Sequence, residues 1–411
     1  MLPPVWREFT RFQCGRFLTV AGTQMAHVAV GWQVYYSTRS KLALGYVGLA
    51  QFVPVAALSL VAGQVADRVD RRLVVASCHA LVALAWASLG LSTLRDGLDL
   101  KVVWASMALL GLARAFQGPA AQALFPSLVP DHLFGRAVGL SSSLWQLATI
   151  VGPALGGLAY QRAASPSWIY FTASVMAALA AALTLGVHPR PMASARKAVT
   201  LHEVLAGVRY LRGAPVVLGA ITLDLFAVLL GGAVALLPVF ASDILHVGPR
   251  GLGALRSAPA LGAAVTALAL GWRPIERCAG RWMLGSVLVF GLATVLFGVS
   301  ESAWLSLLAL VVVGASDMVS VVVRQHAVQR ATPDAMRGRV SAINLVFVGA
   351  SNELGEFESG LTAEWWGPVG AAVFGGLGTC GVVLLAAVLF PSLRRLDRLE
   401  DLRKEEGAST T

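Results

Sequence analysis

Long apolar stretches recur along almost the whole chain, and they limit its fold more than any other feature of the sequence. Twelve of them, bounded by arginine, proline, aspartate or glycine, lie within the 411 residues. Each is close to the roughly 20 apolar residues that a helix needs to cross the hydrocarbon core of a bilayer. Only 13% of the residues are charged, against about a quarter in an ordinary soluble domain. The sequence therefore predicts an all-α membrane protein and excludes most soluble enzyme folds.

The predicted spans form two groups of six, separated by the one long connection. The first group covers residues 12–36, 45–66, 73–94, 102–125, 137–160 and 168–187, and the second covers 216–240, 251–270, 282–299, 304–323, 340–361 and 369–390. The connection contains LHEVLAGVRYLRG, which has the spacing of an amphipathic helix at a membrane surface. We expect an N-terminal bundle over 1–190, a cytoplasmic linker over 191–213, a C-terminal bundle over 214–390 and a charged cytoplasmic tail over 391–411.

The basic residues are distributed unevenly between the loops on the two sides of the predicted membrane. Loops on the side of the termini carry 24 Lys and Arg residues, and the opposite loops carry seven. Because basic residues near span ends are retained in the cytoplasm, this bias places both termini there. It also explains the formal charge of +10 without a nucleic-acid partner. The four cysteines and the histidines show no metal-site spacing, so we expect no metal and no cofactor.

The two halves of the chain repeat one another at an offset of 203 residues. The segment PDHLFGR at Pro130–Arg136 overlays PDAMRGR at Pro333–Arg339. The register continues without a gap, so that Gly152 falls on Gly355 and Gly157 falls on Gly360. This repeat predicts two pseudo-symmetric six-helix bundles, an organisation typical of secondary transporters with a substrate site near the midplane.

The connection between spans 2 and 3 reads GQVADRVDRR, from Gly63 to Arg72. It resembles the cytoplasmic signature GxxxDRxGRR of the major facilitator superfamily, with Asp70 in place of a glycine. Positive-inside anchoring alone is the simpler explanation of such a loop. The resemblance implies a cytoplasmic gate in which an acidic side chain faces the positive end of a helix in the other half. It assigns this gate to Asp67, Arg68, Arg71 and Arg72.

Span 4 contains an arginine at membrane depth, in the sequence LGLARAFQGPAA. A charged residue there costs at least about 2.5 kcal/mol unless it faces a cavity or a partner. A salt bridge that holds the bundle together is one explanation for Arg114. The segment also resembles the fourth-helix pattern LxxxRxxQGxxAA of the superfamily. That resemblance implies that Arg114 takes part in proton coupling or contacts an anionic substrate group, with Gln117 in the substrate cavity.

Span 5 carries glycines at fixed spacing around a Gly-Pro pair. Small residues allow close helix packing in membranes, and proline bends the helix. The spacing is similar to the antiporter motif of facilitator exporters, G-x(8)-G-x(3)-GP-x(2)-GG, with Ala148 in place of one glycine. The resemblance therefore implies an exporter. Its motif residues here are Gly152, Pro153, Gly156 and Gly157.

The second half has carboxylates at membrane depth, Asp224 in span 7 and Asp317 in span 10. Asp317 falls on the repeat position of Arg114. A buried carboxylate must be paired, hydrated or protonated, so both aspartates are candidates for proton coupling together with Arg114. Asp317 could instead pair with Arg324, seven residues later on the same helical face, whereas Asp224 has no local partner. In span 11, Glu353 and Glu356 either pack against the arginine-rich cytoplasmic loops or line a polar vestibule.

Over its whole length the chain resembles the bacterial exporter branch of the superfamily, which includes enterobactin exporters and macrolide-type drug efflux proteins. The resemblance implies no enzyme activity but proton-coupled export of a small organic molecule across the cell inner membrane, with protons and lipid as further partners and a functional monomer. Siderophore-like metabolites and amphipathic drugs remain alternative substrates. A lipid-handling or non-transporting sensor relative is the third alternative. We expect the substrate cavity to include Arg16, Thr23 and His27 besides Gln117.

Overall fold

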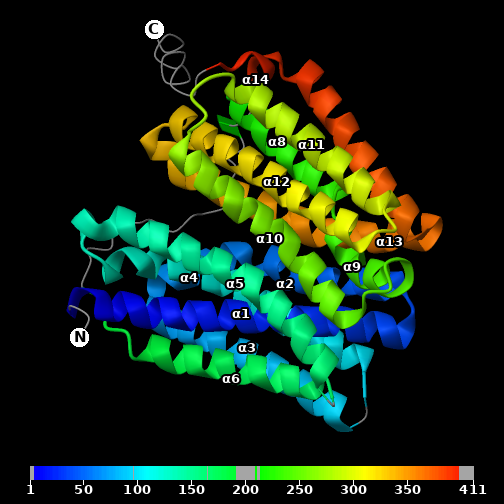
Figure 1. Ribbon diagram of the computed structural model, residues 1–411. Helices are drawn as coiled ribbons and strands as arrows, with labels where there is room; N and C mark the ends of the chain where they lie inside the picture. Colours follow the sequence, from blue (N-terminus) through cyan, green and yellow to red (C-terminus); the bar gives the residue numbers. More distant parts are fainter. Residues whose placement is uncertain (1–3, 96, 164, 191–208, 211–212, 398–411) are drawn as a thin grey trace. The chain divides into compact units, whose positions relative to one another are not determined.

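The computed structural model describes residues 4–95, 97–163, 165–190, 209–210 and 213–397. Within these ranges the side chains of residues 4, 5, 59, 60, 66, 67, 334, 335, 337–339, 341–346 and 350 are not described. Every regular element in the described part is helical (Figure 1). The predicted amphipathic helix of the linker lies largely outside these residues, as does most of the predicted tail.

The first of two compact units consists of Met1–Val199 together with Ala241–Ser257. Its long helices are α1 (Pro4–Thr38), α2 (Lys41–Arg68), α3 (Arg71–Arg95), α4 (Leu100–Leu124), α5 (Phe134–Arg162) and α6 (Ser167–Leu185). They match the first six predicted spans. Helix α1 packs against α5 and α6, α3 packs against α4 and α6, and α2 packs against α4. Side-chain caps fix two of the helix starts: Ser40 accepts from the Ala43 amide, and Asp99 accepts from the Lys101 amide.

The second unit consists of Thr200–Phe240 and Ala258–Thr411. It contains α8 (Pro215–Leu230), η3 (Ala233–Leu236), α9 (Leu237–Val239), α11 (Ala279–Val299), α12 (Ala303–Ala331), α13 (Asp334–Leu389) and α14 (Pro391–Arg395). Helix α10 (Gly248–Trp272) begins in the first unit and continues into the second. Helix α8 packs against α12 and α13, and α11 packs against the same two helices.

Three of the predicted spans differ from the separate, continuous helices that the sequence suggested. Span 7 ends as an α-helix at Leu230, and short turns follow as far as the π-helical turn Phe240–Ile244. The break coincides with the glycine pair Gly231 and Gly232. A Cβ placed on Gly232 would lie 2.8 Å from the carbonyl oxygen of Gly355. Spans 11 and 12 both lie in α13, interrupted at Gly367, whose φ of 74° favours glycine. Pro368 follows this interruption.

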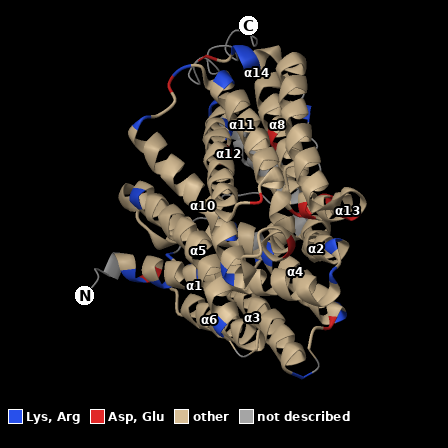
Figure 2. Cartoon of the chain, turned by 45° about the vertical axis from the view of Figure 1, so that its right-hand side comes forward, with Lys and Arg blue, Asp and Glu red and all other residues tan. Residues whose placement is uncertain are grey.

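Within the described residues, nine helical segments are long and apolar enough to cross a membrane. One of them, Phe347–Leu389, contains the interruption at Gly367 and thus most of two predicted spans. Helices α1 and α4 are also long enough, but they are not among the nine segments that are sufficiently apolar. Charged side chains are sparse along the helices (Figure 2). The fold is the predicted all-α arrangement of twelve transmembrane helices in a multi-pass membrane protein.

Candidate functional site

A polar network joins α1, α3 and α4 in the interior of the first unit. The Thr19 hydroxyl lies 2.9 Å from Nδ1 of His79, and the Gln117 amide nitrogen lies 3.4 Å from the same atom. Thr19 and His79 are both buried. The network places Gln117, a predicted cavity residue, beside α1, where Thr23 lies one turn beyond Thr19 and is half-buried. His79 was not predicted, because an isolated histidine in an apolar stretch has no distinctive spacing.

His27, one turn further along α1, lies between polar and basic groups. Its Nε2 is 3.4 Å from the Gln51 amide nitrogen on α2, and its ring meets Trp86 edge-on at 5.7 Å. Two arginines of the same unit act on it electrostatically, Arg256 from α10 and Arg114 from α4. The structure therefore brings together two predicted site residues, His27 and Arg114. It adds Arg256, which the loop count had assigned to the membrane surface opposite the termini.

Arg16 lies in the N-terminal half of α1, against α5. Its Nη1 donates a hydrogen bond of 2.8 Å to the Ser141 hydroxyl, and its guanidinium lies 4.8 Å from the centre of the Trp145 ring. The buried amide nitrogen of Gln13 lines the same small hollow and makes no hydrogen bond within the described residues. Among the described residues, Arg16 is thus held by α5 and forms no ion pair with an acid.

In the second unit, Arg324 on α12 forms an ion pair with Asp224 on α8. Each side chain is only 5% exposed. This pairing differs from the alternative that the sequence suggested, in which Arg324 would neutralise Asp317. The reason is the packing of α8 against α12, which supplies Asp224 with the partner that its own helix lacks. Asp317 remains an electrostatic neighbour of both members of the pair.

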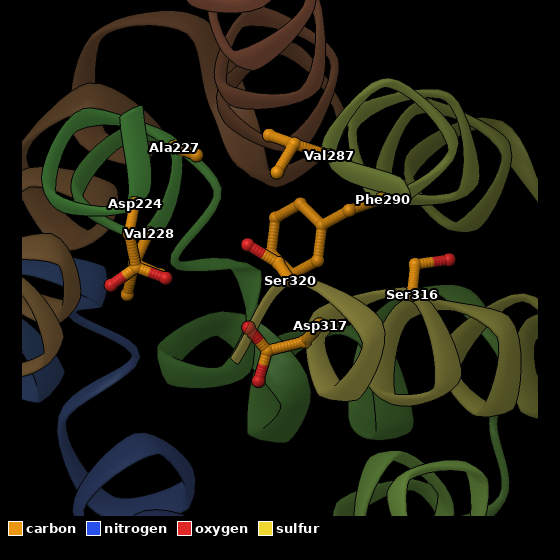
Figure 3. Close-up of a pocket in the computed structure, with 8 residues that line it drawn as sticks. All are labelled: Asp224, Ala227, Val228, Val287, Phe290, Ser316, Asp317 and Ser320. Carbon is orange, nitrogen blue, oxygen red and sulfur yellow. The ribbon is translucent and has the colours of Figure 1, made fainter. Parts of the chain in front are cut away.

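Asp224 and Asp317 line one cavity (Figure 3). Ser316 and Ser320 complete its polar lining, and its apolar walls are Ala227, Val228, Val287 and Phe290. The space is sufficient for about one water molecule. A space of this size excludes an organic substrate but admits a water molecule beside two carboxylates. The arrangement is suited to holding and moving a proton.

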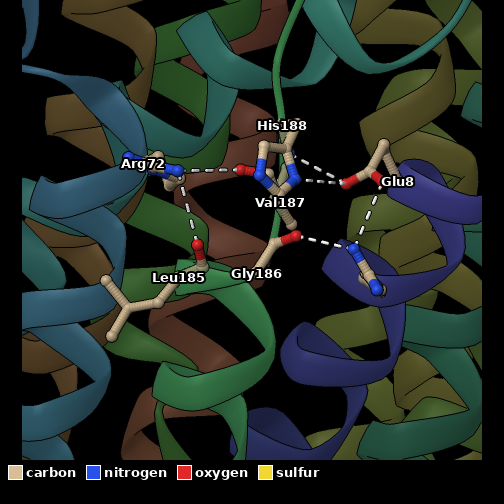
Figure 4. Close-up of polar contacts among 7 residues, drawn as sticks. Glu8, Arg72, Leu185, Gly186, Val187 and His188 are labelled. Carbon is tan, nitrogen blue, oxygen red and sulfur yellow. Dashed lines mark hydrogen bonds and ion pairs between the residues drawn. The ribbon is translucent and has the colours of Figure 1, made fainter.

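Arginines of the predicted cytoplasmic gate bind helix ends inside the first unit. Arg71 donates to the Ala123 carbonyl near the end of α4, at 3.2 Å. Arg72 donates to the carbonyls of Leu185 and Val187 at the end of α6, at 3.4 and 3.2 Å (Figure 4). A cation at a helix C-terminus is stabilised by the helix dipole. These bonds show a structural role that the motif did not predict.

The remaining gate residues have fewer contacts. The side chain of Arg68 is exposed, and that of Asp67 lies outside the described residues. A Cβ at Gly63, the first residue of the motif, would meet no described atom within 4 Å.

The glycines of span 5 make the close approaches that small residues permit. A Cβ at Gly156 would lie 2.5 Å from the Met25 carbonyl oxygen, and one at Gly152 would lie 2.8 Å from that of Ala21, so α5 presses directly on α1. Gly157 faces the start of α10 instead, where its would-be Cβ lies 2.9 Å from Gly253 Cα. Pro153 lies within α5 on this stretch.

A further polar cluster of the first unit joins the end of α1 to the turn that precedes α10. Tyr35 donates a hydrogen bond to Asp243, and Arg39 forms an ion pair with it at 3.1 Å. No sequence pattern indicated this cluster, because Asp243 lies 208 residues after Tyr35 and 204 after Arg39.

On α13, Glu353 is buried and Glu356 is half-buried. They flank the position at which Gly355 packs against the carbonyls of Val228 and Leu229 on α8. The structure thus places both glutamates at a helix crossing of the second unit. No group of three or more His, Cys, Asp or Glu side chains that could hold a metal occurs among the residues that the structure describes.

Comparison with known proteins agrees with the fold over most of the chain. A family model described as Major Facilitator Superfamily matches residues 14–356. The enterobactin exporter EntS of Shigella boydii serotype 18 is 27% identical over 388 residues, which cover 92% of this chain and 91% of that protein. The enterobactin exporter EntS of Citrobacter koseri is 26% identical over 388 residues, which again cover 92% of this chain and 91% of that protein.

Solved structures are similar at lower identity. The nucleoside transporter NupG matches with a TM-score of 0.70 and 14% identity, covering 95% of this chain and 99% of that one. A bacterial homologue of the iron transporter ferroportin, in an inward-facing state, matches with a TM-score of 0.69 and 17% identity, covering 96% and 100%. At these identities the likeness concerns the fold alone.

Proposed function

Since the chain belongs to the major facilitator superfamily, a family of membrane transporters, we propose that it exports a small anionic organic molecule from the cytoplasm in exchange for protons. The observation that carries the proposal is the buried Asp224–Arg324 pair beside Asp317, around a cavity too small for anything but water. A buried acid that gains and loses a proton can couple transport to the proton gradient, and alternating access at a midplane site is the mechanism of such carriers.

The basic groups of the first unit support an anionic substrate. His27, Arg114 and Arg256 lie close enough to interact, and Arg16 lies further along the same helix as His27. The arginines of this group attract a carboxylate or a catecholate and repel a cationic drug. Together with the relatives named as enterobactin exporters, this favours a siderophore or a similar secreted metabolite. Broad drug efflux is the second candidate.

Other assignments belong to the same proposal. Asp67, Arg68, Arg71 and Arg72 form the cytoplasmic gate. Gly152, Pro153, Gly156 and Gly157 allow α5 to move against its neighbours during the cycle. Thr23 and Gln117 line the substrate path, and Glu353 and Glu356 line its polar entrance. The protein works in the cell inner membrane, with both termini in the cytoplasm.

Inside-out membrane vesicles test the proposed function. An imposed proton gradient, acidic inside, should drive accumulation of iron-free enterobactin, and a protonophore should abolish it. Vesicles from cells without the protein serve as the control for passive uptake. Ethidium, a cationic probe, should not accumulate above that control. If ethidium accumulates and enterobactin does not, the proposal of metabolite export is wrong and drug efflux takes its place.

A further inference from the structure

The buried groups around the cavity of the second unit do not balance in charge. Asp224 and Asp317 are two acids, and Arg324 is the one cation that acts on them in the described part of the chain. Fully ionised, the three groups would leave a net charge of −1 among buried helices. An uncompensated charge in such surroundings is costly. The cluster therefore holds one proton, and because Arg324 binds Asp224, that proton is on Asp317.

Ser320 is a polar residue of the cavity that takes no part in the ion pair. Its hydroxyl is buried, lines the cavity and makes no hydrogen bond within the described residues. Ser316 lines the same cavity, but its hydroxyl donates to the Val312 carbonyl at 2.7 Å. Figure 3 shows the Ser320 hydroxyl on the side of the carboxylates and the Ser316 hydroxyl pointing away from them. A buried hydroxyl without a partner costs free energy unless water satisfies it.

Helix geometry aligns Ser320 with its acidic and basic neighbours. Asp317, Ser320 and Arg324 are separated by three and four residues, so they lie on one face of α12. The α11 wall of the cavity is formed by Val287 and Phe290, which carry no charge. On α13, Glu353 and Glu356 flank the crossing with α8, and neither they nor Glu358 line the cavity. A water in the cavity thus has three polar partners, Asp224, Asp317 and Ser320. Three partners are typical of buried water.

We propose that the cavity binds one water molecule, positioned by Ser320, which relays a single proton between Asp317 and Asp224. This inference deepens the proposed function and rests on it for the use of the proton in transport. In the step, the O–H bond of the Asp317 acid breaks and its proton joins the water. The water gives one of its own protons to the Asp224 carboxylate and is regenerated. Arg324 then leaves the neutral Asp224 and pairs with the ionised Asp317, two turns earlier on its own helix.

Infrared spectroscopy of the purified protein in lipid tests this relay without any substrate. The wild type should show the band of a protonated carboxyl that exchanges its proton in D₂O. Asp224→Asn and Asp317→Asn should each remove that band, because the remaining acid stays ionised beside Arg324. Survival of the band in either variant would overturn the idea of one shared proton. Glu353→Gln identifies any contribution from that glutamate.

Ser320 variants test the water itself. Ser320→Ala should slow the exchange of the carboxyl proton in D₂O about tenfold, as expected for the loss of one hydrogen bond from the relay. Ser320→Val, which also fills the cavity, should do the same, and Ser320→Thr should restore the rate. Ser316→Ala is the matched control and should behave as the wild type. Wild-type exchange in both Ser320→Ala and Ser320→Val would overturn the relay, whatever the vesicles show for enterobactin.

Conversely, a failure to transport enterobactin with the infrared results as expected would overturn the proposed substrate and leave the relay standing.

Discussion

Arg324 on α12 pairs with Asp224 on α8, 100 residues away in sequence, and not with Asp317 on its own helix. One arginine is thereby placed between two acids that belong to different helices. This relationship determines what substitutions at the three positions should do, because either acid can serve as the partner of the same cation.

Loss of both acids should destabilise the protein far more than loss of either. Asp224→Asn or Asp317→Asn alone leaves one carboxylate for Arg324. The double variant removes both acids from the surroundings of a buried guanidinium, at a cost of about 3–5 kcal/mol. Adding Arg324→Gln should restore stability, measured by thermal unfolding in detergent. A single variant as unstable as the double one would contradict the exchange of partners.

Coupling of transport to protons should depend on Asp317 more strongly than the passage of substrate through the protein does. Asp317→Asn fixes this position in a neutral form, so proton-driven accumulation in inside-out vesicles should collapse. Exchange of labelled for unlabelled substrate without a gradient should survive. If the residue has only a structural role, accumulation and exchange should instead fall together with the amount of folded protein.

The span 5 glycines offer a test with a matched control in the same helix. Gly156→Leu or Gly157→Leu places a side chain where a Cβ alone would lie 2.5 Å from a backbone oxygen. Transport should be lost with the protein still present in the membrane. Gly139→Leu should transport normally, because a Cβ at Gly139 would meet nothing within 4 Å. Equal transport in all three variants would show that close packing of α5 is dispensable.

Membrane topology can be measured with fused reporters. A reporter that is active only in the cytoplasm should be active when fused after Thr411 or inserted within residues 194–199. Both positions follow from the excess of basic residues in the loops on that side. A periplasmic signal from either fusion would invalidate the assigned orientation and the gate with it.

The sequence predicted the spans well because the length of an apolar run is set by bilayer thickness, which is independent of tertiary contacts. The break after Leu230 could not be predicted in this way. Glycine pairs are common in membrane helices, and here the contact of Gly232 with Gly355 accompanies the end of the helix. Only the three-dimensional packing brings these two residues together.

Pairing of charges was the least predictable feature of the candidate site. Helical spacing suggested Arg324 for Asp317, because spacing detects partners on one helix only. The ion pair with Asp224, the bond from Arg16 to Ser141 and the bonds from Arg72 to the end of α6 all join different helices. Their residue types were recognisable as unusual at membrane depth or at a span end, but their partners depend on which helices pack together.

The assignment of Ala241–Ser257 to the first unit has a consequence for protein engineering. A chain cut in the linker would yield an N-terminal fragment without the segment that supplies Gly253 against Gly157 and Ser257 against the Ile150 carbonyl. That fragment alone would expose a glycine-lined face of α5. When the two fragments are co-expressed, each should therefore allow the other to accumulate. Neither fragment should survive proteolysis when it is expressed alone.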